Sequence, residues 1–199
     1  MRKLLLTIAL ATTAAAVTAP AASAAPEPEP AMLSLRGWSL LSPSATVPSG
    51  FGHLTLAIDA RTPATPGRAS GQPFGHATIQ HVFLDPKGSW QGTVRIEVNV
   101  DCLTTTGPTS PTAATATVTG TVASLTFLVP PGTAQPTPAA NSWHPETSFS
   151  VPLDKSSPAK VGWSGIPDYQ NPAAPPVATT CAPPATATFF RIHGGYSLT

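Results

Sequence analysis

Residues 90–102 read WQGTVRIEVNVDC and carry the clearest structural pattern in the chain. Apolar and polar residues alternate along this stretch, with Trp90, Val94, Ile96, Val98 and Val100 at positions of the same parity. Strict alternation is typical of a β-strand that turns one face toward a hydrophobic core. Cys102 continues the apolar parity, so we expect its sulfur to point into the core with the valines. That position favours a structural disulfide over a reactive thiol.

The same alternation appears on both sides of this strand. Upstream, residues 54–60 place Leu and Ile on one face and Thr and Asp on the other. Downstream, residues 115–122 alternate Thr with Ala, Val and Gly, and β-branched residues suit a pleated surface. The apolar parity then shifts by one position at Leu125 and Phe127. This shift predicts a β-bulge or a tight turn near Ala123 and Ser124.

Weaker strand signals complete the pattern at residues 32–41, 75–84, 147–153, 160–165 and 185–198. Segments rich in Pro, Thr, Gly and Ala separate them, and the chain contains 25 prolines, which would interrupt most helices. No long window free of Gly and Pro shows helical spacing of apolar residues. The sequence therefore predicts an all-β domain over residues 48–199, an antiparallel sandwich or barrel of about seven to eight short strands. Of the two, we favour the sandwich.

The N-terminal segment has the features of a secretory signal peptide. Arg2 and Lys3 precede a short apolar run, and Ala22-Ser23-Ala24 forms a small-residue processing site, so we expect cleavage after residue 24. The alternative, a membrane anchor, needs about 20 apolar residues, and this run is shorter. Residues 25–47 are expected to form a Pro-rich spacer with a possible short first strand. The mature protein should be secreted, without a membrane span, and possible association with the cell envelope stays open.

The charge balance of the chain limits the classes of molecule that it is expected to bind. The chain has 10 Lys and Arg against 9 Asp and Glu, and loss of Arg2 and Lys3 leaves 8 − 9 = −1. A nearly neutral domain creates no field that would concentrate nucleic acid, so we expect no nucleic-acid partner. We also expect a monomer and no cofactor.

Two cysteines, Cys102 and Cys181, remain in the exported chain. An even count in an oxidising compartment predicts one disulfide bond between them. The alternatives are two free thiols or, with less support, a metal site with two cysteine ligands.

No catalytic constellation emerges from the residue spacing. In a strand, His76 and His81 would lie on opposite faces, so they cannot share a metal ion. His53 should lie on a polar strand face, and His144 and His193 are expected in turns. Residues 162–165 read GWSG but lack the second glycine of a nucleophile elbow, because position 166 is Ile. We therefore assign no catalytic residue and no metal ligand.

Carboxylates and aromatic residues are the remaining candidates. Glu97 and Asp101 would lie about 13 Å apart along one strand face, too far for a glycosidase pair, and a solvated face is the simpler interpretation. Trp143 and Tyr169 lie in Pro-rich loops, where an aromatic ring could stack on a sugar or pack on a peptide. The alternative is that each ring folds its loop onto the sheet. Trp90 and Trp163, which lie within strand patterns, are expected in the core.

Several segments together resemble a group of small exported proteins of actinobacterial type. The matching pieces are residues 75–77 (GHA), 98–103 (VNVDCL), 116–122 (ATVTGTV), Cys181 and residues 194–196 (GGY). The resemblance covers about two-thirds of the mature chain. It implies an all-β fold with one disulfide bond and carries over no catalytic or binding residue.

The function expected from these observations is that of a non-catalytic binding module or a module associated with the cell envelope. Its partner would be a wall polymer, another extracellular polymer or a protein. Two alternatives stay open at this point. One is an extracellular hydrolase whose site is assembled only in the fold. The other is a secreted protein that acts through an apolar contact surface with a partner.

Overall fold

The computed structural model describes residues 32–41, 51–62, 75–106, 114–136, 143–154, 159–171 and 173–199. All regular structure in these ranges is β-strand, which confirms the all-β class. There is thus no helix in them that is long and apolar enough to cross a membrane. The predicted signal peptide, residues 1–24, lies outside the described residues, as does most of the predicted spacer.

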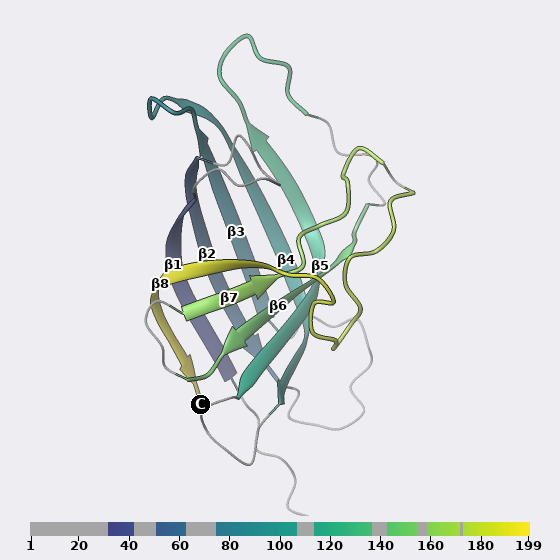
Figure 1. The fold of residues 1–199 in the computed structure, drawn as a ribbon. Coiled ribbons are helices and arrows are strands. Elements are labelled where there is room, and N and C mark those ends of the chain that lie inside the picture. The colour runs from purple at the N-terminus through teal and green to yellow at the C-terminus, as the bar shows by residue number, and fades with distance from the viewer. Residues whose placement is uncertain are drawn as a thin grey trace, which may run out of the picture.

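Eight strands follow one another within the described ranges. They are β1 (Met32–Leu41), β2 (Gly52–Arg61), β3 (Gly75–Leu84), β4 (Trp90–Thr106), β5 (Thr115–Leu128), β6 (Glu146–Pro152), β7 (Ala159–Trp163) and β8 (Thr188–Leu198). Each strand pairs antiparallel with its neighbours in sequence, and β8 returns to β1 to close a barrel. No strand crosses over another, so the barrel, and not the sandwich that the sequence analysis favoured, is the architecture. Figure 1 shows β6, β7 and β8 in front of the wall formed by β1–β5.

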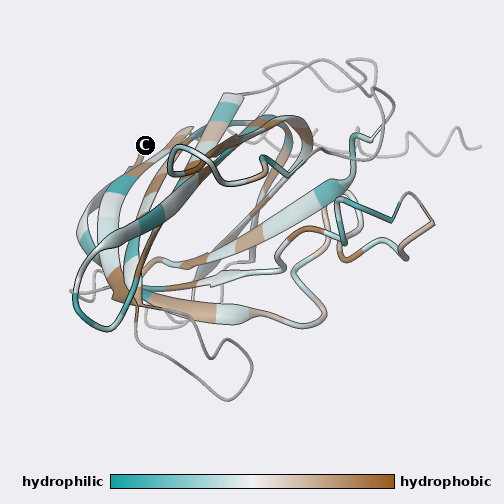
Figure 2. Cartoon of the chain, turned by 90° about the horizontal axis from the view of Figure 1, so that it is seen from above, coloured by the Kyte–Doolittle hydropathy of each residue, from teal (hydrophilic) through white to brown (hydrophobic). Residues whose placement is uncertain are grey.

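The core fills the inside of the barrel. Hydrophobic and hydrophilic residues alternate along the strands (Figure 2), and every strand contributes apolar side chains to one buried cluster. The largest fully buried apolar side chains are Phe149, Leu33, Leu35, Ile58, Ile79, Val98, Val100, Val118, Val122, Val151 and Val161. The alternation read from the sequence is therefore the alternation between the inside and the outside of the barrel.

Three register shifts interrupt this alternation. In each, one residue is inserted in a strand without a partner opposite it: Gln91 between β3 and β4, and Asp101 and Ala123 between β4 and β5. The shift at Ala123 confirms the predicted bulge, which brings Leu125 opposite Ile96 of the core. A bulge reverses the faces of the residues beyond it, so each shift exchanges inside for outside.

Two expectations were wrong because of these bulges. Trp90 was expected in the core, but its side chain is 38% exposed, since the bulge at Gln91 turns it to the outer face. Cys102 was expected to point inward with the valines. The bulge at Asp101 pairs it with Thr119, whereas the next pair, Leu103 and Val118, belongs to the core. Cys102 therefore lies on the outer face of the barrel.

The disulfide bond between Cys102 and Cys181 is present, with Cα atoms 5.4 Å apart and a separation of 79 positions in sequence. It fastens the loop between β7 and β8 to the outer face of the barrel. The backbone N–H of Cys181 donates to Thr119 Oγ1 at 3.0 Å, and Ser148 Oγ donates to the carbonyl oxygen of Ala182 at 2.8 Å. Both hydroxyl side chains are fully buried, because the loop covers them. The bond is compatible with an extracellular location.

The barrel closes where β8 meets β1. The first half of β8 pairs with β7 and its second half with β1, and the strand bends between the two (Figure 1). At this closure Gly37 lies opposite Gly194. A Cβ atom on Gly194 would lie 2.6 Å from Gly37 Cα, and one on Gly37 would lie 2.7 Å from the carbonyl oxygen of His193. Because such contacts do not occur, only glycine allows the two backbones to approach this closely.

Replacing both cysteines with alanine should destabilise the fold. A bond that closes a loop of this length contributes about 3–5 kcal/mol. For a domain of this size the thermal midpoint should fall by roughly 6–20 °C. Thermal unfolding followed by circular dichroism measures the shift. An unchanged midpoint, together with two titratable thiols in the unmodified protein, would contradict the bond.

The closure can be tested with two neighbouring glycines. Gly194→Ala should destabilise the barrel by about 1–3 kcal/mol, because the new methyl group meets the backbone of β1. Gly195→Ala is the matched control, since a Cβ atom there has no heavy atom within 4 Å. Urea unfolding of both variants gives the comparison. Equal stability of the two variants would show that β1 and β8 do not approach as described.

Candidate functional site

The outer side of β7, β8 and β1 gathers exposed aromatic and basic side chains. In β8, Ile192 is buried in the core, so the alternate positions Phe189, Arg191 and His193 face outward. Phe189 is 54% exposed. In β1, Trp38 also faces outward and is 47% exposed. An indole this exposed on a regular strand leaves a large apolar ring in contact with water.

Strand register joins these side chains into one surface. Lys160 of β7 lies opposite Arg191, and Trp38 of β1 lies opposite His193. Alternate residues of a strand are about 7 Å apart, so Phe189, Arg191 and His193 form a row along β8. We call these five residues, Trp38, Lys160, Phe189, Arg191 and His193, the β8 face.

Two ring contacts organise the β8 face. The rings of Trp38 and His193 stack with centroids 4.9 Å apart and planes inclined by 26°. Lys160 Nζ lies 4.6 Å from the centroid of the Phe189 ring, within the range of a cation–π interaction. The arrangement presents a flat stacked pair next to two cationic side chains, and all of it is anchored on strands.

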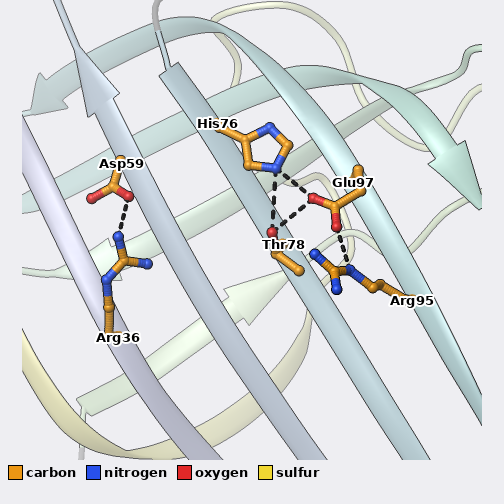
Figure 3. Close-up of polar contacts among 6 residues, drawn as sticks. All are labelled: Arg36, Asp59, His76, Thr78, Arg95 and Glu97. Atoms are coloured by element: carbon orange, nitrogen blue, oxygen red, sulfur yellow. Dashed lines mark hydrogen bonds and ion pairs between the residues drawn. The ribbon is translucent and has the colours of Figure 1, made fainter.

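The charge of this surface is one-sided. The strands β7, β8 and β1 contain no Asp or Glu, whereas they contain Lys160, Arg191 and Arg36. Arg36 forms an ion pair with Asp59 of the neighbouring strand β2 (Figure 3). The two basic residues of the β8 face thus lie on strands that supply no carboxylate of their own.

The outer face of β3 and β4 differs, because its charges are compensated (Figure 3). Glu97 accepts hydrogen bonds from Thr78 and Arg95 and contacts His76. Burial raises the pKa of Glu97, but these three partners together outweigh burial, and the net pKa is lowered. The polar groups of this cluster bind one another on the surface, and we assign no ligand to it.

The same cluster does not have the geometry of a catalytic triad. In a triad, one ring nitrogen of the histidine takes the proton of the nucleophile, and the carboxylate holds the N–H group of the other ring nitrogen. Here Thr78 Oγ1 lies 3.3 Å from His76 Nε2, and Glu97 contacts the same nitrogen. Thr78 also donates its own proton to Glu97 at 2.8 Å. Glu97 therefore does not orient His76 from the far ring nitrogen, and the Thr78 hydroxyl donates to Glu97 and not to His76.

The structure places the two candidate loop aromatics against the barrel. Trp143 is partly buried and packs on the core cluster, and the Tyr169 ring lies 4.9 Å from the ring of Phe127. The two residues are not part of the β8 face. Their role in ligand binding stays a prediction. Trp163 also packs on the core cluster, as expected for a strand tryptophan.

The histidines divide between the two faces of the barrel. His76 is exposed on the outside, and His81 is half-buried beside the core residue Leu54, its partner in β2, which confirms that the two lie on opposite faces. His53 is exposed, as predicted. His193 was expected in a turn, which was wrong: it lies within β8, because the two glycines that follow it belong to the closure of the barrel.

A second pair of carboxylates lies near the loop that the disulfide fastens. Burial raises the pKa of Glu146, the charge of Asp101 raises it further, and hydrogen bonds from Thr119 and Thr180 oppose the shift.

The Ser164 hydroxyl accepts the backbone N–H of Ser148 at 3.0 Å, which is a structural role. Within the described ranges no three His, Cys, Asp or Glu side chains converge in a way that could hold a metal ion.

Comparison with known proteins gives no identification. No protein-family model matches the chain, and neither a curated protein nor a solved structure matches it. The resemblance to exported actinobacterial proteins therefore stays an expectation from short motifs.

The sequence did not predict the β8 face, because Trp38 reaches the residues of β8 only when β8 pairs with β1 and closes the barrel. Residues 32–41 and 185–198 gave only weak strand signals, and they lie at opposite ends of the domain. The alternation around Ile192 could have placed Arg191 and His193 on one outer face. Nothing in the spacing could have shown that Trp38 lies beside them.

His81 generates a prediction about pH. Burial lowers the pKa of His81 to about 4, and its Nε2 atom is buried without a hydrogen-bond partner among the described residues. In the unfolded chain the pKa is about 6.5, so the unfolded state takes up the proton first as pH falls. Protonation of His81 in the unfolded chain therefore lowers the free energy of unfolding as pH falls from 6.5 toward 4. Above pH 6.5 the residue is neutral in both states and has no such effect.

His81→Leu should remove this loss. The difference in free energy of unfolding between pH 7.5 and pH 4.5 should be smaller in the variant than in the unmodified protein. Urea unfolding at the two pH values measures it. The same difference in both proteins would mean that His81 is not held in an apolar environment.

Proposed function

We propose that the protein is a non-catalytic binding module, secreted or associated with the cell envelope, that holds an extracellular polymer on the β8 face. The observation that carries the proposal is the exposed stack of Trp38 and His193 on regular strands. The disulfide bond is compatible with an extracellular location, and the N-terminal sequence predicts export.

An exposed aromatic pair suits a ligand with flat apolar faces. The faces of sugar rings carry C–H groups that pack on indole and imidazole rings, while the hydroxyl groups at the ring edges remain in water. Aromatic side chains also supply a large contact area at a low cost in conformational entropy, because they have only two rotatable bonds. The stack of Trp38 on His193 restricts both rings further before any ligand arrives.

The position of the residues favours an elongated ligand. Phe189 and His193 are four residues apart on one strand face, about 13 Å, and Trp38 extends the surface onto β1. A polymer with repeating units can contact the whole row, whereas a single sugar would contact only one part. A site on strands is also held more rigidly than one on loops.

The first test is co-sedimentation of the mature protein, residues 25–199, with insoluble cell wall, chitin and cellulose. Trp38→Ala should weaken binding about five- to thirty-fold, since loss of a stacking ring costs about 1–2 kcal/mol. Trp90→Ala is the matched control, because Trp90 is also exposed but lies on β4. Heat-unfolded protein controls for non-specific adsorption.

Further arms of the same assay separate the competing proposals. Trp143→Ala and Tyr169→Ala test the loop aromatics, and loss of binding in these variants but not in Trp38→Ala would overturn the β8 face. Release of soluble fragments from the polymer during incubation would contradict a non-catalytic role and favour a hydrolase. Absence of saturable binding to any of the polymers would contradict polymer binding itself.

A further inference from the structure

The basic residues of the β8 face are arranged unfavourably for stability alone. Lys160 and Arg191 lie directly opposite each other on neighbouring strands, where Cβ atoms are about 5 Å apart. Like charges at such positions repel each other and destabilise a sheet. The cation–π contact with Phe189 accommodates Lys160 but leaves the positive charge in place.

The three strands concerned do not compensate this charge. β7, β8 and β1 carry no acidic residue. Of the two strands beside them, β2 supplies Asp59, which Arg36 and Ser34 engage, and β6 supplies Glu146, which lies opposite Thr121 of β5 and outside the part of β6 that pairs with β7. On β3 and β4, by contrast, basic side chains share the carboxylate of Glu97. Among the described residues, no ion pair engages Lys160 or Arg191, so a ligand that supplies the opposite charge would relieve their repulsion.

We infer that the ligand of the β8 face is a polyanion: a polymer of sugar or polyol units that carries phosphate or carboxylate groups, one of which binds between Lys160 and Arg191. This inference rests on the proposed function and names its ligand class. The guanidinium of Arg191 presents two parallel N–H donors, which fit two oxygens of a phosphate or carboxylate. Lys160 adds a second positive charge from the facing strand.

The aromatic stack sets the spacing of the ligand. His193 lies two residues from Arg191 on the same strand face, about 7 Å away, and Trp38 lies opposite His193. Because the anion lies between β7 and β8 and Trp38 lies on β1, a bound polymer would place an anionic group roughly 10 Å from a ring that stacks on Trp38, about 7 Å along the strands and about 7 Å across them. A repeating unit of one ring and one anion spans this distance.

Single-stranded nucleic acid also combines rings with phosphates, but the observations disfavour it. Nucleic-acid binding usually depends on many phosphate contacts and a strongly basic surface. The β8 face has two cationic side chains outside the Arg36–Asp59 pair, and the chain carries a formal net charge of +1. A short anionic segment matches this charge better than a continuous phosphate backbone does.

The experiment compares three forms of one polymer. Unmodified dextran, carboxymethyl dextran and dextran phosphate share a backbone and differ in charge, so differences in Kd report the anionic group. The Kd for at least one charged form should be about tenfold lower than for unmodified dextran. Raising NaCl from 50 to 500 mM should weaken that binding several-fold, because salt screens exposed charges. The order of the two charged forms identifies phosphate or carboxylate as the preferred group.

Two double variants provide the matched test. Lys160→Gln with Arg191→Gln removes both charges and should weaken binding to the charged dextran about tenfold or more. Lys160→Arg with Arg191→Lys keeps both charges and should retain most of the binding. Positions 160 and 191 are both exposed, and thermal unfolding of each variant verifies that the barrel is intact.

The outcomes separate this inference from the proposed function. Equal Kd values for the three dextrans, or unchanged binding by the double glutamine variant, would overturn the polyanion. If Trp38→Ala still weakened binding to insoluble polymers in that case, the binding module would stand with a neutral ligand. Tighter binding of a single-stranded oligonucleotide than of either charged dextran would also overturn the inference and indicate nucleic acid.

Discussion

The close approach of β1 and β8 at Gly37 and Gly194 is the constraint on which the barrel depends. Seven of the eight strand pairings join neighbours in sequence, so each can form from a local hairpin or a short connection. The eighth joins the two ends of the domain and must bring two backbones together where any side chain would collide. Closure removes the free edges of the sheet and completes the core, and it also places Trp38 beside His193 on the outside. One backbone contact thus determines both the fold and the candidate binding surface.

The inside and the outside of the barrel differ in the side chains that they carry. The inside is filled by apolar side chains, and burial there lowers the pKa of His81. The outside is divided into regions. The disulfide-fastened loop covers part of β5 and β6 and buries Thr119 and Ser148, and a compensated network covers β3 and β4. The β8 face has neither a covering loop of described residues that contacts it nor acidic residues on its strands, which is why we place ligand binding there.

The sequence predicted the strands well and their faces less well. Alternation located three strands clearly and the bulge at Ala123, because one buried face forces a period of two, whereas the other five strands gave only weaker signals. It misplaced Trp90 and Cys102, since an inserted residue at Gln91 or Asp101 leaves no mark in composition and becomes visible only against the partner strand. The disulfide could be predicted from the cysteine count, but not its place outside the core. The β8 face could not be predicted, because it requires the pairing of the first and last strands, whose separation in sequence exceeds the range of any local pattern.

The central claim is that ligand binds to β7, β8 and β1, and chemical-shift mapping tests it most directly. Isotope-labelled mature protein is titrated with the dextran derivative that binds it best, and backbone and indole N–H signals are followed by NMR. The account predicts saturable shifts confined to Lys160, Phe189, Arg191 and His193 with their strand neighbours, and to the indole of Trp38. Shifts that cluster around Trp143 and Tyr169, with the β8 face unchanged, would contradict it.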